Sequence, residues 1–100
     1  MADQVKYALY VRLVPKQGKN KEVEEFLKSA LPLVQQEPGT ERWFALREDD
    51  NAYSIFDTFN DEAARDAHLN GEVAKALGAK ASELFAEPPQ INKVDVLAQK

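Results

Sequence analysis

The sequence predicts a domain of the α+β class, with a four-stranded antiparallel sheet and helices packed on one of its faces. Segments with the two-residue alternation of strands and segments with helical spacing follow each other in the order β, α, β, β, α, β. A chain of 100 residues can bury one hydrophobic core but not two. We therefore expect a single domain that spans residues 1–100.

The first strand is expected over Val5–Val14, where β-branched and aromatic residues dominate. A Pro- and Gly-containing turn follows it, and Asn20 is a candidate N-cap for the next element. That element is an amphipathic helix, because apolar residues recur at helical spacing from Val23 to Val34. Pro32 lies inside this pattern and is expected to kink the helix or to end its regular hydrogen bonding.

The second and third strands are expected over Thr40–Glu48 and Ala52–Phe59. Residues 49–51 are Asp, Asp and Asn, which tolerate the left-handed backbone of tight turns, so the two strands should form a hairpin. Asn60 is the candidate N-cap of a second helix, and two acidic residues follow it in the position that a helix N-terminus favours.

The second helical segment is expected to be interrupted near Asn70 and Gly71 and then to resume up to a pair of prolines. Ile91–Leu97 has the pattern of a short last strand. Residues 98–100 are expected to fray as a tail. With right-handed crossovers, this order of elements corresponds to the ferredoxin-like βαββαβ arrangement.

Both faces of the predicted sheet carry large apolar or aromatic residues, for example Trp43 on one face and Phe44 on the other. Two helices can cover only one face. We therefore predict a homodimer in which the second face packs against the same face of another copy, since most soluble oligomers are symmetric. The alternative is a monomer with a partly exposed apolar sheet.

Composition excludes several classes of protein. No apolar stretch approaches the roughly 20 residues that span a bilayer, and a net charge of −4 disfavours nucleic acid, so neither a membrane nor a nucleic-acid partner is expected. There is no cysteine, and His68 is the single histidine, so no disulfide, thiol chemistry or metal site is expected. The N-terminal segment lacks the pattern of a signal peptide, which predicts a cytoplasmic protein.

Four segments together resemble one known family. They are a first strand running through a turn into a helix, a short turn, a third strand leading into a helix, and a helix end before the last strand: LVPKQGKNKEVEEFL, EPGT, DTFNDEAARDAHL and LFAEPPQI. In this order and spacing, covering nearly the whole chain, they resemble the antibiotic biosynthesis monooxygenase (ABM) family. Its members are dimeric α+β barrel proteins built on the ferredoxin-like fold.

The resemblance implies oxidation of quinols, polyketide phenols or similar aromatics without metal or flavin, so no cofactor is expected. Other members degrade haem, and many have no demonstrated activity. The family often has a Trp at the end of the third strand, where this chain has Phe59, and the haem-degrading branch tends to carry an Asn on the first strand, which is absent here. Both departures argue against haem chemistry.

His68 is the natural general base, because it is the only side chain with an ordinary pKa near neutrality. Phe59 precedes the presumed N-cap and should pack against Ala64, which shares a helix face with His68, so the three residues form one candidate pocket wall. The alternative is a surface His68 in contact with water, Asp57 or Asp61. Asp57 itself is expected to cap the helix rather than to orient His68.

Oxygenation without a cofactor requires a base, an aromatic cage and a polar anchor, because the substrate itself must reduce dioxygen. Arg12 or Arg42 is the candidate anchor for an anionic oxygen. Core packing is the competing interpretation for each aromatic residue. The candidate cage residues are Tyr7, Trp43, Phe44, Tyr53, Phe56 and Phe59.

Two classes of function remain open, so whether the protein is an enzyme is left undecided by the sequence. One is a cofactor-independent monooxygenase of a small aromatic, phenolic or quinol substrate. The other is a non-catalytic dimeric module that binds a small ligand or has a stress or regulatory role; an isomerase of the muconolactone type is a weaker third option. A pocket that His68 faces favours catalysis, whereas a filled interior with His68 in solvent favours the module.

Overall fold

The computed structural model describes residues 5–100 and has the predicted α+β fold. Four antiparallel strands lie in the order β2-β3-β1-β4, which is the ferredoxin-like arrangement. The elements are β1 (Tyr7–Leu13), α1 (Asn20–Val34), β2 (Thr40–Asp49), β3 (Ala52–Phe59), α2 (Glu62–Leu69), α3 (Glu72–Leu84) and β4 (Gln90–Asp95). The first four residues, on which part of the signal-peptide argument rests, lie outside the described residues.

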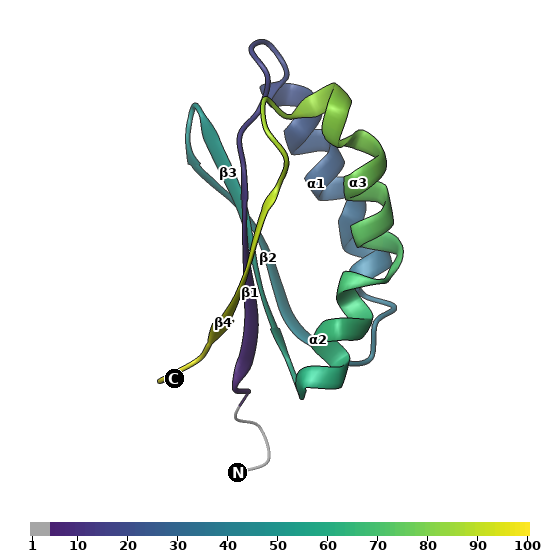
Figure 1. Ribbon diagram of the computed structural model, residues 1–100, viewed down its shortest axis with the longest axis vertical. Helices are drawn as coiled ribbons and strands as arrows, with labels where there is room; N and C mark the ends of the chain where they lie inside the picture. Colours follow the sequence, from purple (N-terminus) through teal and green to yellow (C-terminus); the bar gives the residue numbers. More distant parts are fainter. Residues whose placement is uncertain (1–4) are drawn as a thin grey trace.

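All three helices pack on one face of the sheet, and the opposite face is bare (Figure 1). The register places Leu9 of β1 beside Asp57 of β3, and Asp57 beside Trp43 of β2. Since strand side chains alternate between faces, these three residues lie in one row beneath the helices. The hydrophobic core forms on this face from strand and helix residues: Val11, Leu13, Val23, Leu27, Tyr53, Ile55, Leu77, Leu84 and Phe85.

Both predicted N-caps are wrong, each by one position. Lys19 occupies the N-cap of α1, while the Asn20 amide donates a hydrogen bond to the Asp50 carbonyl at 2.6 Å and so ties the helix to the hairpin turn. Asp61, not Asn60, caps α2, and its carboxylate accepts from the Ala64 N–H at 2.7 Å. A carboxylate at this position also complements the helix dipole.

The remaining element predictions differ in detail from the structure. The break at Asn70 and Gly71 is confirmed, since α2 ends at Leu69 and α3 begins at Glu72. Pro32 does not end α1, which continues to Val34. The turn after Asp49 forms without a left-handed residue, because within residues 5–100 only Gly18 has a positive φ. The predicted first and last strands are each longer than β1 and β4.

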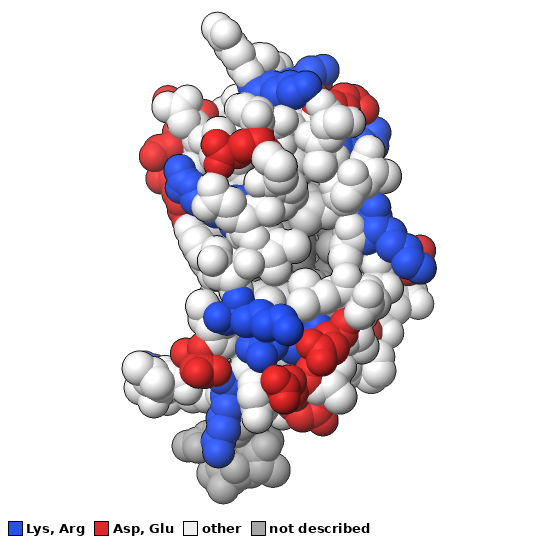
Figure 2. All heavy atoms as spheres, in the orientation of Figure 1, with Lys and Arg blue, Asp and Glu red and all other residues white. Residues whose placement is uncertain are grey.

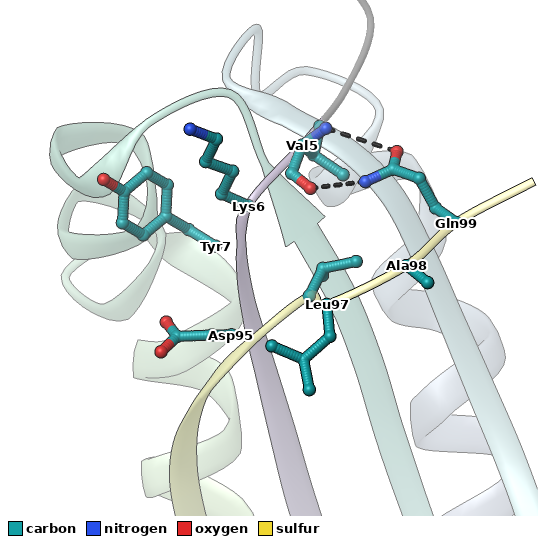
Figure 3. A pocket seen from close by; sticks show the side chains of 8 residues that line it. Val5, Lys6, Tyr7, Asp95, Leu97, Ala98 and Gln99 are labelled. Carbon is teal, nitrogen blue, oxygen red and sulfur yellow. Dashed lines mark hydrogen bonds between the residues drawn. The ribbon is translucent and has the colours of Figure 1, made fainter.

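The C-terminal tail is held rather than frayed. The Gln99 side chain accepts from the Val5 N–H at 3.2 Å and donates to the Val5 carbonyl at 2.6 Å, as the dashed lines in Figure 3 show. A side-chain amide can replace a backbone peptide in this pairing because it carries both a donor and an acceptor. The chain end is therefore hydrogen-bonded to Val5, two residues before β1.

Charged side chains of both signs are interspersed on the face shown in Figure 2 and form no basic patch there. Nucleic-acid binding requires clustered Lys and Arg, so this face does not have the charge distribution of a nucleic-acid interface. Among the described residues, no helix combines the length and apolar character needed to cross a membrane.

Candidate functional site

Helix α2 brings His68 to the sheet. The helix is short and rich in alanine, and its two buried side chains are polar ones, Arg65 and His68. They are three residues apart and therefore lie on one helix face, the face turned toward the strands. His68 is only 8% exposed, so the predicted alternative of a surface histidine is wrong, although the contact with Asp57 that it included is present.

Two carboxylates hold the two sides of the His68 ring. Nδ1 lies 2.6 Å from Oε1 of Glu37, in the loop between α1 and β2, and Nε2 lies 2.9 Å from Oδ2 of Asp57, on β3. The Phe59 ring packs against the imidazole with 5.2 Å between centroids. Asp57 was expected to cap α2; because Asp61 does so, Asp57 is free to contact His68, and the capping prediction is wrong.

The contact between His68 and Asp57 is close, but its geometry is not that of a well-formed hydrogen bond. Although 2.9 Å separates Nε2 from Oδ2, both Asp57 oxygens lack a hydrogen-bond partner of good geometry among the described residues. Asp57 is fully buried, so its charge interacts with the ring at low local dielectric. The carboxylate therefore favours the protonated form of His68 through this close contact and through its charge.

Burial lowers the pKa of His68, but the contacts with Asp57 and Glu37 outweigh it, and the net result is a raised pKa. Burial also raises the pKa of the Asp57 carboxyl, against the opposing effect of His68. The neighbouring carboxylates therefore favour the protonated form of His68, whereas burial disfavours the ionised form of Asp57. A histidine with these neighbours carries its proton to higher pH than an exposed one.

The EPGT segment builds the wall opposite α2. Glu37 Oε1 accepts a hydrogen bond from the Thr40 hydroxyl at 2.7 Å and also contacts His68. The last residue of the segment therefore helps to hold the carboxylate of the first in place. A Cβ at Gly39 would lie 2.5 Å from the Ala64 Cβ, so glycine permits the loop to approach α2 this closely. Glu37 was absent from the predicted site residues, although its segment was part of the family resemblance.

A pocket of about 590 Å³ opens between this loop, the end of α1 and helix α2. His68 and Glu37 contribute to its lining together with residues that are mostly small or apolar. The elements that contribute to it, α2 and the segment that leads into β2, face each other at the lower right of Figure 1. The lining residues besides those two are Leu33, Gln36, Pro38, Gly39, Thr40, Asp61, Ala63, Ala64, Ala67, Gly71 and Glu72.

The predicted aromatic cage does not line this pocket. Phe59 and Tyr53 are completely buried core residues, and the Tyr53 hydroxyl donates to Glu24 at 2.5 Å. Trp43 packs against the hydrophobic core and against a second buried cluster of Ala30, Val34 and Val73, and its buried Nε1 has no partner among the described residues. Phe59 contributes to the site only through the packing of its ring against the His68 ring.

Tyr7 and Arg12 lie elsewhere. Arg65 stacks over the Tyr7 ring, and Tyr7 borders a separate hollow beside the C-terminal tail, where Figure 3 shows it on the same side of the strands as Asp95. Arg12 alternates with the buried Val11 and Leu13, so it points to the bare face of the sheet, away from His68. Neither residue can contact a ligand in the pocket beside His68.

The three side chains His68, Glu37 and Asp57 are not arranged as a metal site. The carboxylates contact opposite nitrogens of the ring, so they do not converge on a common point. In the described part of the chain, no group of three or more His, Asp or Glu side chains is placed to share a metal ion. What the arrangement provides is a buried acid–base group at the edge of a mostly apolar pocket.

Several solved structures share this fold. A protein of unknown function from Nitrosomonas europaea is 50% identical, with 96% of this chain and 93% of that chain covered and a TM-score of 0.93. A protein from Pseudomonas aeruginosa is 18% identical over 95% and 97% of the two chains, with a TM-score of 0.80. A protein from Caulobacter crescentus, proposed to be an antibiotic biosynthesis monooxygenase, is 22% identical over 95% and 92%, with a TM-score of 0.78.

No curated protein sequence matches the chain. The sequence model of the antibiotic biosynthesis monooxygenase family matches residues 7–80, from the start of β1 into α3. The matched region includes Glu37, Asp57 and His68 and therefore the whole acid–base cluster. Since this match covers well over half of the sequence, the protein belongs to the antibiotic biosynthesis monooxygenase family.

Proposed function

We propose that the protein is a cofactor-independent monooxygenase that oxidises a small aromatic, phenolic or quinol substrate in the pocket beside His68. The observation that supports this proposal is the burial of the only histidine between two carboxylates at the edge of a mostly apolar pocket. Perturbed acid–base groups in such pockets are typical of catalytic sites. Membership of the family agrees with this activity.

The chemistry needs no external reductant. A phenol and dioxygen give a quinone and water: one oxygen atom becomes the new carbonyl, the other leaves as water, and the substrate supplies all four electrons. The step that the protein must assist is removal of the phenolic proton, because the phenolate is the species that transfers an electron to dioxygen. Because both ring nitrogens face carboxylates, the neutral His68 ring accepts this proton by way of the Glu37 carboxylate, which contacts Nδ1, while Asp57 holds the other side of the ring.

Oxygen consumption tests this proposal. The purified, metal-stripped protein is supplied with a panel of quinols and hydroxylated aromatics and compared with His68→Gln and with a control, Glu83→Gln, at the far end of α3. We expect uptake above the autoxidation background in the wild type and the control, and a loss of about 10²-fold or more in His68→Gln. The wild-type rate should rise with pH through the raised pKa of His68, since only the neutral ring is a base. Equal rates in all three proteins would exclude His68 as the base.

A second candidate function is a non-catalytic module that binds a small ligand. It is favoured by the occupation of both His68 nitrogens and by the packing of Phe59 and Tyr53 in the core rather than around a cavity. A ligand that binds in this pocket without oxygen uptake by any substrate of the panel would support this candidate over the enzyme.

We also propose that two copies pair through the bare face of the sheet. Phe44 and Leu46 project from β2 on this face and are 48% and 41% exposed, and the half-buried Tyr10 and Phe56 lie on the neighbouring strands. Contiguous apolar side chains of this size usually mark an interface. In a dimer with two-fold symmetry, the bare face of each sheet would pack against the same face of the other copy.

A further inference from the structure

We propose that the pocket beside His68 selects aromatic ligands by charge, accepting uncharged or positively charged molecules and excluding anionic ones. The proposal rests on the proposed function for its site, but it concerns the charge that a ligand carries when it enters the pocket. Transfer of a phenol proton to His68 inside the pocket leaves the total charge there unchanged, whereas an anionic ligand adds a negative charge. It replaces the prediction that an arginine holds an anionic oxygen of the substrate, because Arg12 and Arg42 point to the opposite face of the sheet.

The charged groups that line the pocket are carboxylates, apart from His68. Glu37, Asp61 and Glu72 come from the loop before β2, the N-cap of α2 and the first turn of α3, and no Lys or Arg is among the described residues that line it. Three separate segments therefore place acidic groups around one opening. A negatively charged ligand would meet repulsion from these carboxylates, and no Lys or Arg in the described lining offsets it.

His68 does not supply an offsetting positive charge. Its ring already contacts Glu37 on one nitrogen and Asp57 on the other, at 2.6 and 2.9 Å, so the imidazolium charge is offset inside the protein. An incoming anion would have to displace Glu37 to reach Nδ1. Displacement would also break the Thr40 hydrogen bond to the same carboxylate oxygen.

Arg65 and Lys75 lie on the two helices that contribute to the pocket, and neither directs a positive charge into it. Arg65, on the same helix as His68, is buried and donates to the Ala8 carbonyl at 3.3 Å and the Val94 carbonyl at 3.4 Å, over β1 and β4. Lys75 lies 3.7 Å from the Glu72 carboxylate, but both side chains are exposed and solvent screens the pair. The pocket therefore has no directed positive charge.

Glu37 also offers an acceptor to the ligand. Its Oε1 is occupied by His68 and Thr40, whereas Oε2 has no hydrogen-bond partner among the described residues and lies beside Gly71, where an added Cβ would be 3.2 Å away. A ligand O–H or N–H can donate to this oxygen while its ring packs on the apolar lining, including Leu33 and Ala67. An uncharged phenol or an arylammonium fits this combination.

Three ligands of nearly equal size test the proposal: 4-hydroxybenzyl alcohol, 4-hydroxybenzylamine and 4-hydroxybenzoate, which are neutral, cationic and anionic at pH 7. Binding to the full-length protein is followed by NMR chemical-shift titration under nitrogen, so that turnover does not interfere. We expect the alcohol and the amine to shift resonances of pocket residues, and the benzoate to bind at least about tenfold more weakly.

A pair of charge-adding variants makes the test independent of His68. Gln36→Lys places a positive charge in the pocket lining, whereas Gln35→Lys places it one residue away at the exposed C-cap of α1. Benzoate affinity should increase about tenfold or more in Gln36→Lys and change little in Gln35→Lys.

The proposal is overturned if the benzoate binds wild type as tightly as the alcohol, if neither the alcohol nor the amine binds, or if the two lysine variants behave alike. Charge-selective binding without oxygen uptake by any substrate would support this inference and contradict the monooxygenase proposal. The two failures are therefore distinguishable.

Discussion

The pKa of His68 is raised although the ring is almost completely buried, because two carboxylates from distant parts of the chain contact it. Burial alone would favour the neutral ring, since a charge loses its hydration in the protein interior. Glu37 and Asp57 reverse this preference and raise the pKa of His68. The same contacts join α2 to the loop before β2 and to β3, so one residue links three elements.

The raised pKa of His68 predicts a pH-dependent stability. A folded-state pKa above the ordinary value of about 6.5 means that the stabilising contribution is complete below that value and is lost as pH rises through the folded pKa. Urea denaturation of the wild type should therefore show a falling free energy of unfolding from about pH 6.5 upward. His68→Gln should lose this slope; a slope that persists in the variant would assign it to another group.

Asp57→Asn tests whether the buried carboxylate acts on His68 through charge. The variant keeps the shape but removes the charge, so we expect the pKa of His68 to fall and the protein to lose roughly 1–3 kcal/mol of stability. The His68 pKa is read from its ring protons by NMR titration. Asp66→Asn is the control, because Asp66 is an exposed carboxylate on α2, the helix that carries His68. It should leave the titration of His68 unchanged.

The loop between α1 and β2 positions Glu37, because it packs directly on α2. Gly39 lies against the Ala64 side chain, and the loop is tied at both ends, since the Glu37 N–H donates to the Val34 carbonyl and the Asn60 N–H donates to the Gly39 carbonyl. The distance from Glu37 to His68 is therefore set by the packing of two elements and not by either residue alone.

Gly39→Ala should separate the loop from α2. The added Cβ would lie 2.5 Å from the Ala64 Cβ, and overpacking of this kind costs roughly 1–3 kcal/mol. We expect a lower free energy of unfolding and a lower pKa of His68, because Glu37 moves away from the ring. Gly78→Ala is the control: no atom lies within 4 Å of its added Cβ, and a helical Gly to Ala change should stabilise α3 by about 0.5–1 kcal/mol. An unchanged His68 pKa in Gly39→Ala would contradict this role of the loop.

At the scale of the whole molecule, three helices cover one face of the sheet and leave the other without a partner (Figure 1). Phe44 and Leu46 are the most exposed large apolar residues on the bare face. Nothing within residues 5–100 covers them. The shape of the molecule therefore predicts an association that the chain cannot satisfy by itself.

Phe44→Glu should prevent this association. A carboxylate at the centre of a symmetric interface meets its own copy or an apolar surface, and both are unfavourable. Size-exclusion chromatography with light scattering at micromolar concentration should give a dimer for the wild type and a monomer for the variant. Leu31→Glu, at an exposed apolar position on α1, should remain a dimer. A monomeric wild type would contradict the interface.

The family and the order of elements could be predicted from the sequence because both depend on local patterns. Strand alternation and helical spacing are properties of neighbouring residues, and the EPGT and DEAARDAHL segments are contiguous. His68 could be identified as the acid–base group because the chain has no other histidine. The alternation of side chains along a strand also places Tyr7 and Arg12 on opposite faces, so these two candidate site residues cannot share a pocket.

The partners of His68 were decided only by tertiary structure. Glu37 is 31 residues from His68 along the chain, and its carboxylate reaches the ring because Gly39 lets the loop pack on α2. Asp61 caps α2, one residue after the predicted N-cap Asn60. Asp57 is not needed as a cap and contacts His68 instead. The sequence by itself determined that one histidine and many carboxylates are available. The packing of α2 on the sheet decided which of these groups contact each other, because side-chain contacts depend on distances that local sequence patterns do not specify.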